Sequence, residues 1–372
     1  MENPIIQQSS THDEWERELK AFDDTKLGVK GLVDNGVTKV PLIFTKFQAS
    51  KASSPPSDDE FLQVPVIDLG LIGNSSKDTG GVARKDIVTK VRQACEKYGF
   101  FQIVNHGIPQ EILDEMKEGT RRFHEEPNDV KKVYYSRDRL KKVRFTSNYD
   151  LYQAKAANWR DSLISLMLPE PPKPEEFPET CRDITICYSE YAYKLGLTLF
   201  ELLSEALGLK PKHLEEMECA QGMFLLSHYY PACPEPDKTM GNKAHTDPNF
   251  LTILLQDHTG GLQVLVENRW IDVKPVEGAL VINIGDLTQL ISNDKFKSIK
   301  HRVLAPGATP RISVACFFTT NTMYPTNRLY GPIKEILSEE NPAIYRETTI
   351  KDFTIQFDLR LGMTPTLEYY RI

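Results

Sequence analysis

The sequence feature that most constrains the fold is the motif Ala244-His245-Thr246-Asp247-Pro248, taken together with His301. Side chains two residues apart on a β-strand point to the same face, so a strand here would place His245 beside Asp247. A third metal ligand has to come from elsewhere, and Ile299–Val303 offers His301 in a second strand-like run. Two histidines and one carboxylate on one face of a metal leave the opposite positions open, as non-haem Fe(II) sites require. The motif therefore predicts strands that converge on a metal ion.

A single His-x-Asp triplet is weak evidence, because such pairs also arise by chance at protein surfaces. Two histidines and a carboxylate can also hold catalytic zinc. Zinc hydrolases usually carry their histidines on a helix as His-Glu-x-x-His, and this sequence contains no such motif. Arg311-Ile312-Ser313 follows His301 on another strand-like run and could clamp a carboxylate by charge-assisted hydrogen bonds. A 2-oxoglutarate site needs this combination, since the keto acid chelates the metal while the far carboxylate reaches the arginine. The combination favours Fe(II) over zinc.

These motifs resemble those of the plant Fe(II)- and 2-oxoglutarate-dependent dioxygenases, and the resemblance extends from about Glu18 to Ile372. The segment Glu18–Asp34 is similar to the group called 1-aminocyclopropane-1-carboxylate oxidase homologues, which includes deacetoxyvindoline 4-hydroxylase-like enzymes. The resemblance rests on His245-x-Asp247, His301, Arg311-x-Ser313, Val104-Asn105-His106-Gly107-Ile108 and Tyr229-Tyr230-Pro231-Ala232-Cys233-Pro234.

The fold expected from the resemblance is mainly β with flanking α-helices. Its core is a distorted double-stranded β-helix, a cupin-like jelly roll, with an N-terminal helical region and a C-terminal helix. The many short β-runs separated by turns after Gly222 favour the same jelly roll. We expect an N-terminal extension (1–60), an N-terminal dioxygenase region (61–178), a long helix linking the halves (179–221), a jelly-roll core (222–325) and a C-terminal helical tail (326–372).

The local pattern also predicts individual elements. Residues 1–10 look disordered, Thr11-x-x-Glu14 is a capping box that would open a helix through about Asp23, and residues 47–60 read as a solvated loop. Further helices are expected near 82–98, 109–127, 182–207, 286–292 and 348–360. Strands are expected near 64–69, 100–104, 159–166, 224–230, 251–256, 262–266, 270–273, 279–284, 300–304 and 311–319.

The resemblance implies roles for the site residues. Fe(II) would bind His245, Asp247 and His301, and the presence of Asp247 disfavours the halogenating relatives that lack this carboxylate. The far carboxylate of 2-oxoglutarate would bind Arg311, Ser313 and the hydroxyl of Tyr230. The family pattern has an asparagine where this chain has His228, which could contact the metal-side end of the co-substrate or only support the site. No catalytic residue is expected beyond the metal centre.

The substrate pocket is harder to read from the sequence. The resemblance implies that Phe317, which lies past the Arg-x-Ser pair, lines the cavity. Four further aromatics are candidates for a lid: Tyr149, Tyr152, Phe353 and Phe357. For each of them core packing is an equal alternative. The aromatic residues favour an organic substrate with an apolar body over a free amino acid. Other histidines, His124 among them, read as surface residues.

Composition excludes several other classes of function. The formal net charge of -7 gives no basic surface for a phosphate backbone, so nucleic acid is not expected as a partner. The six cysteines form no Cys-x-x-Cys pair and indicate reduced thiols. No secretory signal is visible and no apolar run approaches the roughly 18 residues of a membrane span. We expect a cytoplasmic protein, a monomer, whose partner is a small-molecule substrate.

The implied activity is a 2-oxoglutarate-dependent oxidoreductase that consumes O2 and hydroxylates a plant specialised metabolite, such as an alkaloid or steroidal glycoalkaloid. Succinate and CO2 would be released, and L-ascorbate would keep the iron reduced. One alternative is an oxidase of the 1-aminocyclopropane-1-carboxylate type, which uses ascorbate in place of 2-oxoglutarate. Another is a metabolite-binding protein that has lost catalysis. The sequence does not name the substrate.

Overall fold

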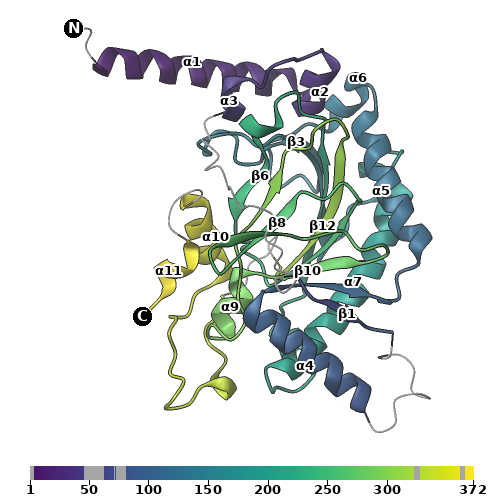
Figure 1. Ribbon diagram of the computed structural model, residues 1–372, viewed down its shortest axis with the longest axis vertical. Coiled ribbons are helices and arrows are strands. Elements are labelled where there is room, and N and C mark those ends of the chain that lie inside the picture. The colour runs from purple at the N-terminus through teal and green to yellow at the C-terminus, as the bar shows by residue number, and fades with distance from the viewer. Residues whose placement is uncertain (1–3, 46–62, 71, 73–80, 322–326, 361–364) are drawn as a thin grey trace.

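Two β-sheets face each other and form the walls of a barrel (Figure 1). The computed structural model describes residues 4–45, 63–70, 72, 81–321, 327–360 and 365–372. The larger sheet has eight strands in the order β1-β2-β10-β7-β12-β5-β4-β3, and the smaller has four in the order β6-β11-β8-β9. The strands are β1 (Val66–Asp68), β2 (Phe100–Val104), β3 (Val143–Ser147), β4 (Asp161–Leu168), β5 (Gly222–Tyr230), β6 (Met240–His245), β7 (Leu251–Gln256), β8 (Leu262–Val266), β9 (Arg269–Asp272), β10 (Leu280–Ile284), β11 (His301–Leu304) and β12 (Arg311–Thr319).

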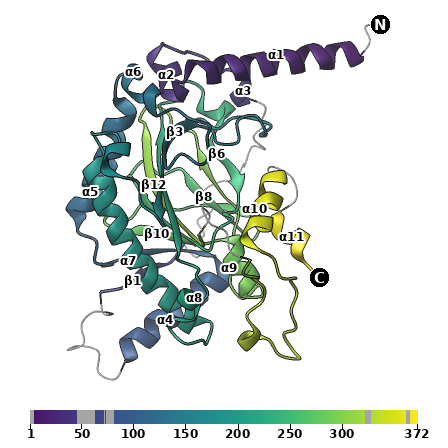
Figure 2. The ribbon, with the colours of Figure 1, turned by 180° about the vertical axis from the view of Figure 1, so that it is seen from behind.

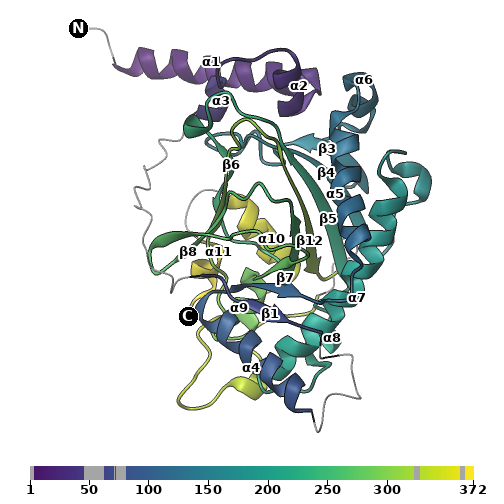
Figure 3. The same ribbon diagram turned by 45° about the vertical axis from the view of Figure 1, so that its right-hand side comes forward.

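Helices cover the outside of the larger sheet and one end of the barrel. Figure 3 shows α5 and α7 along the outer face of the larger sheet, while α1 crosses one end. Figure 2 shows α10 and α11 on the side of the barrel away from α5 and α7. The helices are α1 (Pro4–Thr25), α2 (Gly28–Asp34), α3 (Leu42–Thr45), α4 (Val82–Lys97), α5 (Gln110–Glu125), α6 (Asn128–Lys131), α7 (Arg182–Ala206), α8 (His213–Glu216), α9 (Asp286–Ile291), α10 (Ile350–Leu359) and α11 (Thr366–Tyr370), with 3₁₀ turns at Lys132–Tyr134, Pro174–Glu176, Pro236–Lys238 and Lys334–Ile336.

The expected jelly roll with flanking helices is confirmed. The strands expected in the second half of the chain are present, but the sequence did not predict β3 or β6. The first helix begins at Pro4 and not at Thr11, so disorder was the wrong expectation for residues 4–10. Proline is favoured at the first position of a helix, and no glycine or second proline separates Pro4 from Thr11. The loop expected at residues 47–60 lies outside the described residues.

The larger sheet combines strands from both halves of the chain. β1 to β4 come from the region expected to form an N-terminal unit, yet they flank β10, β7, β12 and β5 in one continuous sheet. The hydrophobic core also combines both halves of the chain, because side chains of α4, α5 and α7 pack with those of the larger sheet in one cluster. The division of the chain into the five expected segments therefore stays a prediction. No helix among the described residues is long and apolar enough to cross a membrane.

The N-terminal helices are tied to the barrel through the first residue of β4. Leu27 precedes α2 and has no side-chain oxygen to cap it, and Asp161 takes over that role. Its two carboxylate oxygens accept hydrogen bonds of 2.8 Å each from the backbone N–H groups of Val29 and Lys30. Carboxylates are favourable at the N-terminal end of a helix, where the backbone N–H groups are unpaired. Gly28 permits this approach, with φ +69° and a Cβ position only 2.4 Å from the Asp161 carboxylate.

We expect Gly28→Ala to release α2 from β4. The added methyl group would both occupy the position of the Asp161 carboxylate and strain a left-handed backbone, lowering the free energy of unfolding by about 3 kcal/mol or more. Gly36→Ala is the matched control, since Gly36 has φ +75° but nothing within 4 Å of its Cβ position. That control should lose only about 1 kcal/mol. Urea denaturation measures both values, and equal losses would contradict the anchoring role of Asp161.

Candidate active site

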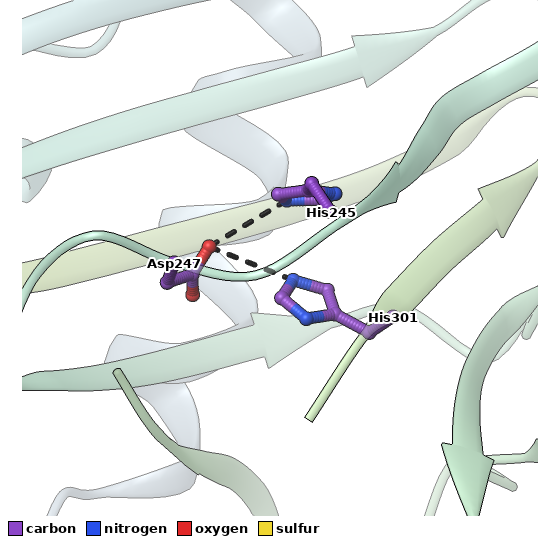
Figure 4. Close-up of side chains that lie close together, drawn as sticks. All are labelled: His245, Asp247 and His301. Atoms are coloured by element: carbon purple, nitrogen blue, oxygen red, sulfur yellow. Dashed lines mark ion pairs between the residues drawn. The ribbon is translucent and has the colours of Figure 1, made fainter. Parts of the chain in front are cut away.

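His245, Asp247 and His301 lie together at the junction of two strands of the smaller sheet (Figure 4). His245 is the last residue of β6, and it pairs directly with His301, the first residue of β11. Their Nε2 atoms lie 3.5 and 3.6 Å from the Oδ1 atom of Asp247. One ligand atom from each of the three residues falls within 4.8 Å of the others, which is the spacing of a metal-binding group. The predicted triad is therefore brought together.

Asp247 does not lie on a strand, so the strand alternation used to pair it with His245 was the wrong reason. β6 ends at His245, Thr246 and Asp247 have no regular secondary structure, and a bend begins at Pro248. Proline has no N–H group to donate to a sheet, and this favours the end of the strand here. The backbone N–H of Asp286, at the start of α9, donates to the carbonyl oxygen of Asp247 over 2.8 Å and fixes the turn. The carboxylate reaches the histidines from a loop.

The larger sheet orients the Asp247 carboxylate. Its Oδ2 atom accepts hydrogen bonds of 2.8 Å from the hydroxyl of Thr252 on β7 and 2.8 Å from the amide of Asn283 on β10. The Oδ1 atom remains directed at the two histidines. Supporting hydrogen bonds of this kind hold a metal ligand in position and raise its affinity for the ion. No spacing in the sequence points to Thr252 or Asn283, because their role depends on contacts between sheets.

The two imidazoles are held with Nε2 facing the same point. The Nδ1 atom of His245 lies 2.8 Å from the carbonyl oxygen of Lys243, and that of His301 lies 3.2 Å from the carbonyl oxygen of Ile299. A backbone carbonyl can only accept, so each Nδ1 carries the proton and each Nε2 presents a lone pair. This tautomer is the one that binds a metal through Nε2.

The electrostatics keep His301 and Asp247 in the protonation states that metal binding requires. Burial lowers the pKa of His301 to about 4, an effect that the neighbouring His245 reinforces and Asp247 opposes. Burial works to raise the pKa of Asp247, but His301, His245 and the Asn283 amide outweigh it and hold that pKa well below its ordinary value. Near neutral pH, His301 is uncharged and Asp247 ionised, and metal binding requires both states.

A second feature of the barrel interior is a buried guanidinium. Arg311 is 1% exposed and donates to Gly260 O over 2.7 Å, Ser313 Oγ over 2.9 Å and Gln256 Oε1 over 3.0 Å. Its guanidinium also lies over the ring of Tyr230, 4.9 Å from the centroid. No carboxylate among the described residues pairs with it, and Gln256 Nε2 is a further buried donor without a partner. A buried cation with spare donors beside it suits a bound carboxylate, so the residues present fit both Fe(II) and 2-oxoglutarate.

Comparisons with known proteins agree with this chemistry. A profile of the 2OG-Fe(II) oxygenase superfamily matches residues 221–320, and one described as non-haem dioxygenase in morphine synthesis N-terminal matches residues 64–183. Deacetoxyvindoline 4-hydroxylase from Catharanthus roseus is 54% identical over 365 residues, covering 96% of this chain and 89% of that protein. The chain belongs to the 2OG-Fe(II) oxygenase superfamily. The predicted family is confirmed, and the chain is a 2-oxoglutarate-dependent oxidoreductase by membership.

Further relatives of this oxygenase support the assignment. 1-Aminocyclopropane-1-carboxylate oxidase homolog 1 from Arabidopsis thaliana is 55% identical, with 90% of each chain covered. The crystal structure of JOX2 in complex with 2OG, Fe and JA superposes with a TM-score of 0.77 at 29% identity, covering 93% of this chain and 97% of that chain. A dioxygenase for auxin oxidation from rice has the same fold, with a TM-score of 0.68 at 24% identity over 83% of this chain and 100% of that chain.

The strand register shows which side chains of the oxygenase share the face of the metal site. Thr252 contacts Asp247, and it lies directly across from Phe317 on β12, which in turn lies across from Phe224 on β5. Residues directly opposite in a sheet project to the same side. Phe317 is half-buried and stacks on Phe224 with ring centroids 5.1 Å apart. The predicted position of Phe317 in the barrel interior follows from this register.

The other four aromatics chosen from the sequence differ in exposure and in the contacts that they make. Phe353 is 1% exposed and stacks on Tyr370 at 5.4 Å, so it packs in the core and offers no surface to a substrate. Tyr152 is 56% exposed and donates its hydroxyl to Asp23 of α1 over 2.8 Å. Tyr149 is 41% exposed, and Phe357 of α10 is half-buried.

Two further histidines are buried, and for His124 this differs from what the sequence suggested. His124 was expected at the surface, but it is fully buried on α5, where its Nε2 lies 3.0 Å from Ser227 O and burial lowers its pKa to about 3. His228 lies across from Ser313 on the interior face, and its Nδ1 is 2.8 Å from Ser162 Oγ. Burial, then the charges of Arg160 and Arg311, hold the pKa of His228 well below its ordinary value. His228 is therefore a neutral ring beside the Arg311 clamp.

We expect Thr252→Val to weaken metal binding without unfolding the oxygenase. The substitution removes the hydroxyl that orients Asp247 and keeps the shape of the side chain, and loss of such a support typically costs about 10- to 100-fold in metal affinity. Thr120→Val is the matched control, because Thr120 is equally buried but its hydroxyl donates only to Met116 O. Competition with a metal chelator measures the dissociation constants. Equal affinities for Fe(II) in the two variants would contradict the orienting role of Thr252.

Proposed function

We propose that this oxygenase hydroxylates a small organic molecule with an apolar body, with release of succinate and CO2. In this proposal His245, Asp247 and His301 hold Fe(II), and Arg311, Ser313 and Tyr230 hold the far carboxylate of 2-oxoglutarate. The observation that carries the proposal is the buried Arg311 guanidinium, which lacks a carboxylate partner among the described residues and shares the barrel with the triad. A relative that is named as a 4-hydroxylase supports hydroxylation and a plant specialised metabolite as the substrate.

Bound Fe(II) and 2-oxoglutarate supply the oxidising chemistry together with O2, and the protein supplies geometry and charge. Asp247 and the two histidines would hold the ion through three of its coordination positions, and the remaining positions would serve the co-substrate and O2. Arg311 and Ser313 bind the carboxylate in a fixed direction, since both donors belong to one strand and are already bonded to each other over 2.9 Å. Ser162 holds the Nδ1 side of His228, so its Nε2 could contact the metal-side end of the co-substrate.

The apolar body of the substrate would bind against the interior face of the larger sheet. Phe317, Phe224, Leu226 and Leu254 are half-buried there, and they share a face through the register of β5, β12 and β7. Apolar walls exclude water and strengthen the electrostatic interactions of the site. Tyr149 and Phe357 remain candidates for the rim of the pocket. Tyr152 would join them only if its hydroxyl gave up the hydrogen bond to Asp23.

We infer three further properties on more indirect grounds. L-Ascorbate would keep the iron reduced during turnover. The enzyme would act as a monomer, because the triad and the clamp come from a single chain. Its six cysteines are unpaired, a state that suits the reducing cytoplasm.

The first test is an anaerobic titration of the Fe(II)-loaded protein with 2-oxoglutarate, following the visible metal-to-ligand charge-transfer band. We expect the band in the wild-type protein, and Arg311→Ala should need at least about 100-fold more 2-oxoglutarate, because breaking a buried ion pair costs about 3–5 kcal/mol. Arg302→Ala is the control: Arg302 lies beside His301 but binds Gln263 and the ring of Trp270. It should leave the titration unchanged.

Two results of this experiment would contradict the proposal. If iron is bound and no band forms, the clamp does not bind 2-oxoglutarate, and an oxidase that uses ascorbate as its co-substrate becomes the better account. If Asp247→Ala retains substrate-dependent release of succinate, the triad is not the metal site.

A further inference from the structure

A second buried arginine lies beside the active site, and no described residue pairs with its side chain. Arg160 immediately precedes β4 and is 4% exposed. Its side chain makes no hydrogen bond or ion pair with any of the described residues, and its Nε atom is buried without an acceptor. A guanidinium has five N–H donors and stays charged at every physiological pH. Burying such a group without a counter-ion is costly, so an unpaired buried arginine calls for an anion that binds there.

The nearest carboxylates in the sequence are committed elsewhere. Asp161 follows Arg160 directly, but both of its oxygens accept from the backbone of α2 on the outer face of the sheet. Asp150 is buried as well and pairs with the ammonium of Lys243 on β6. Acidic residues therefore lie on both sides of Arg160 in the sequence, but neither Asp150 nor Asp161 pairs with its guanidinium.

Several observations direct Arg160 toward the barrel interior. Asp161 lies across from Tyr229 and Ser162 across from His228, so the two faces of β4 alternate in step with those of β5. Asp161 is on the outer face with α2, which places Ser162, the next residue of the strand, on the inner face, and Arg160 immediately precedes this pair. Ser162 occupies that face, since its hydroxyl contacts His228. The charge of Arg160 also acts on His228, together with that of Arg311.

We propose that Arg160 binds a carboxylate carried by the organic substrate. This inference rests on the proposed function and makes its substrate class more specific: an apolar body that bears an anionic end. Arg311 already has Ser313 and the carbonyl oxygen of Gly260 around it and is assigned to the co-substrate. Arg160 has neither, so it offers a second anion site, two residues before the Ser162 hydroxyl that contacts His228. A carboxylate can bind a guanidinium through two parallel charge-assisted hydrogen bonds, and a neutral amide or ester cannot.

The test compares acids with their neutral amides. We suggest 3-phenylpropanoate, 4-phenylbutanoate and 6-phenylhexanoate, each paired with its primary amide, as probes with an apolar body of increasing length. Binding to the full-length enzyme loaded with Fe(II) and 2-oxoglutarate is followed anaerobically by calorimetry and by the change in the charge-transfer band. The wild-type enzyme should bind at least one acid about 10-fold or more tightly than its amide.

Variants of Arg160 then separate charge recognition from a structural role. Arg160→Gln should bring the ratio of acid to amide dissociation constants close to one, and Arg160→Lys should restore part of the preference by restoring the charge. Arg92→Gln is the control for net charge, because Arg92 lies on α4 and donates to the carbonyl oxygen of Ala206. It should retain the wild-type ratio. The Arg160→Lys variant keeps the test valid even if Arg160→Gln fails to fold.

Each other outcome has a definite meaning. Acids that bind the wild-type enzyme no better than their amides, or not at all, overturn the inference. If Arg160→Gln instead weakens 2-oxoglutarate about 10-fold and leaves the acid-to-amide ratio unchanged, Arg160 is a second anchor for the co-substrate and the inference is also overturned. A missing charge-transfer band in the wild-type protein would refute the proposed function itself. The two failures are therefore distinguishable.

Discussion

The hydrogen-bonded carboxylate of Asp247 is the interaction on which the active site depends, because it joins the two sheets. Its Oδ1 atom faces His245 and His301 of the smaller sheet, and its Oδ2 atom is held by Thr252 and Asn283 of the larger one. Asp247 lies in a loop, so the strands alone would not fix its direction. The cross-sheet hydrogen bonds replace the rigidity that a strand would have given. The geometry of the metal site is thus a consequence of how the sheets pack together.

Two buried arginines lie near the active site of a chain whose formal net charge is -7. They are Arg311 on β12 and Arg160 immediately before β4. Neither has a carboxylate partner among the described residues. The desolvation that disfavours these charges in the free protein strengthens their attraction for an anionic ligand, since the local dielectric constant is low. Ligand binding would therefore stabilise the folded protein as well as position the reactants.

Much of the fold and the site could be predicted from the sequence, but only where local pattern decides the structure. The pair Arg311 and Ser313 lies on a true strand, and alternation correctly placed their side chains within 2.9 Å of each other. β6 was missed because Gly241, Asn242 and Lys243 have low β-propensity, and pairing with β11 overrides that preference. Thr252 and Asn283 could not be found at all, since nothing in their spacing relates them to Asp247. Burial of His124 likewise depends on contact between α5 and Ser227 of β5.

The dipeptide Arg160-Asp161 at the start of β4 has two structural consequences. Arg160 immediately precedes the strand that Asp161 begins, and the two side chains form no ion pair despite their opposite charges, because both Asp161 oxygens accept from α2. Asp161 is held outside the sheet by two backbone N–H groups of α2, and burial raises its pKa although these hydrogen bonds oppose the rise. The same contact that docks the N-terminal helices therefore removes the natural counter-ion of Arg160. This single dipeptide thus attaches the N-terminal helices and leaves the Arg160 guanidinium without a carboxylate partner among the described residues.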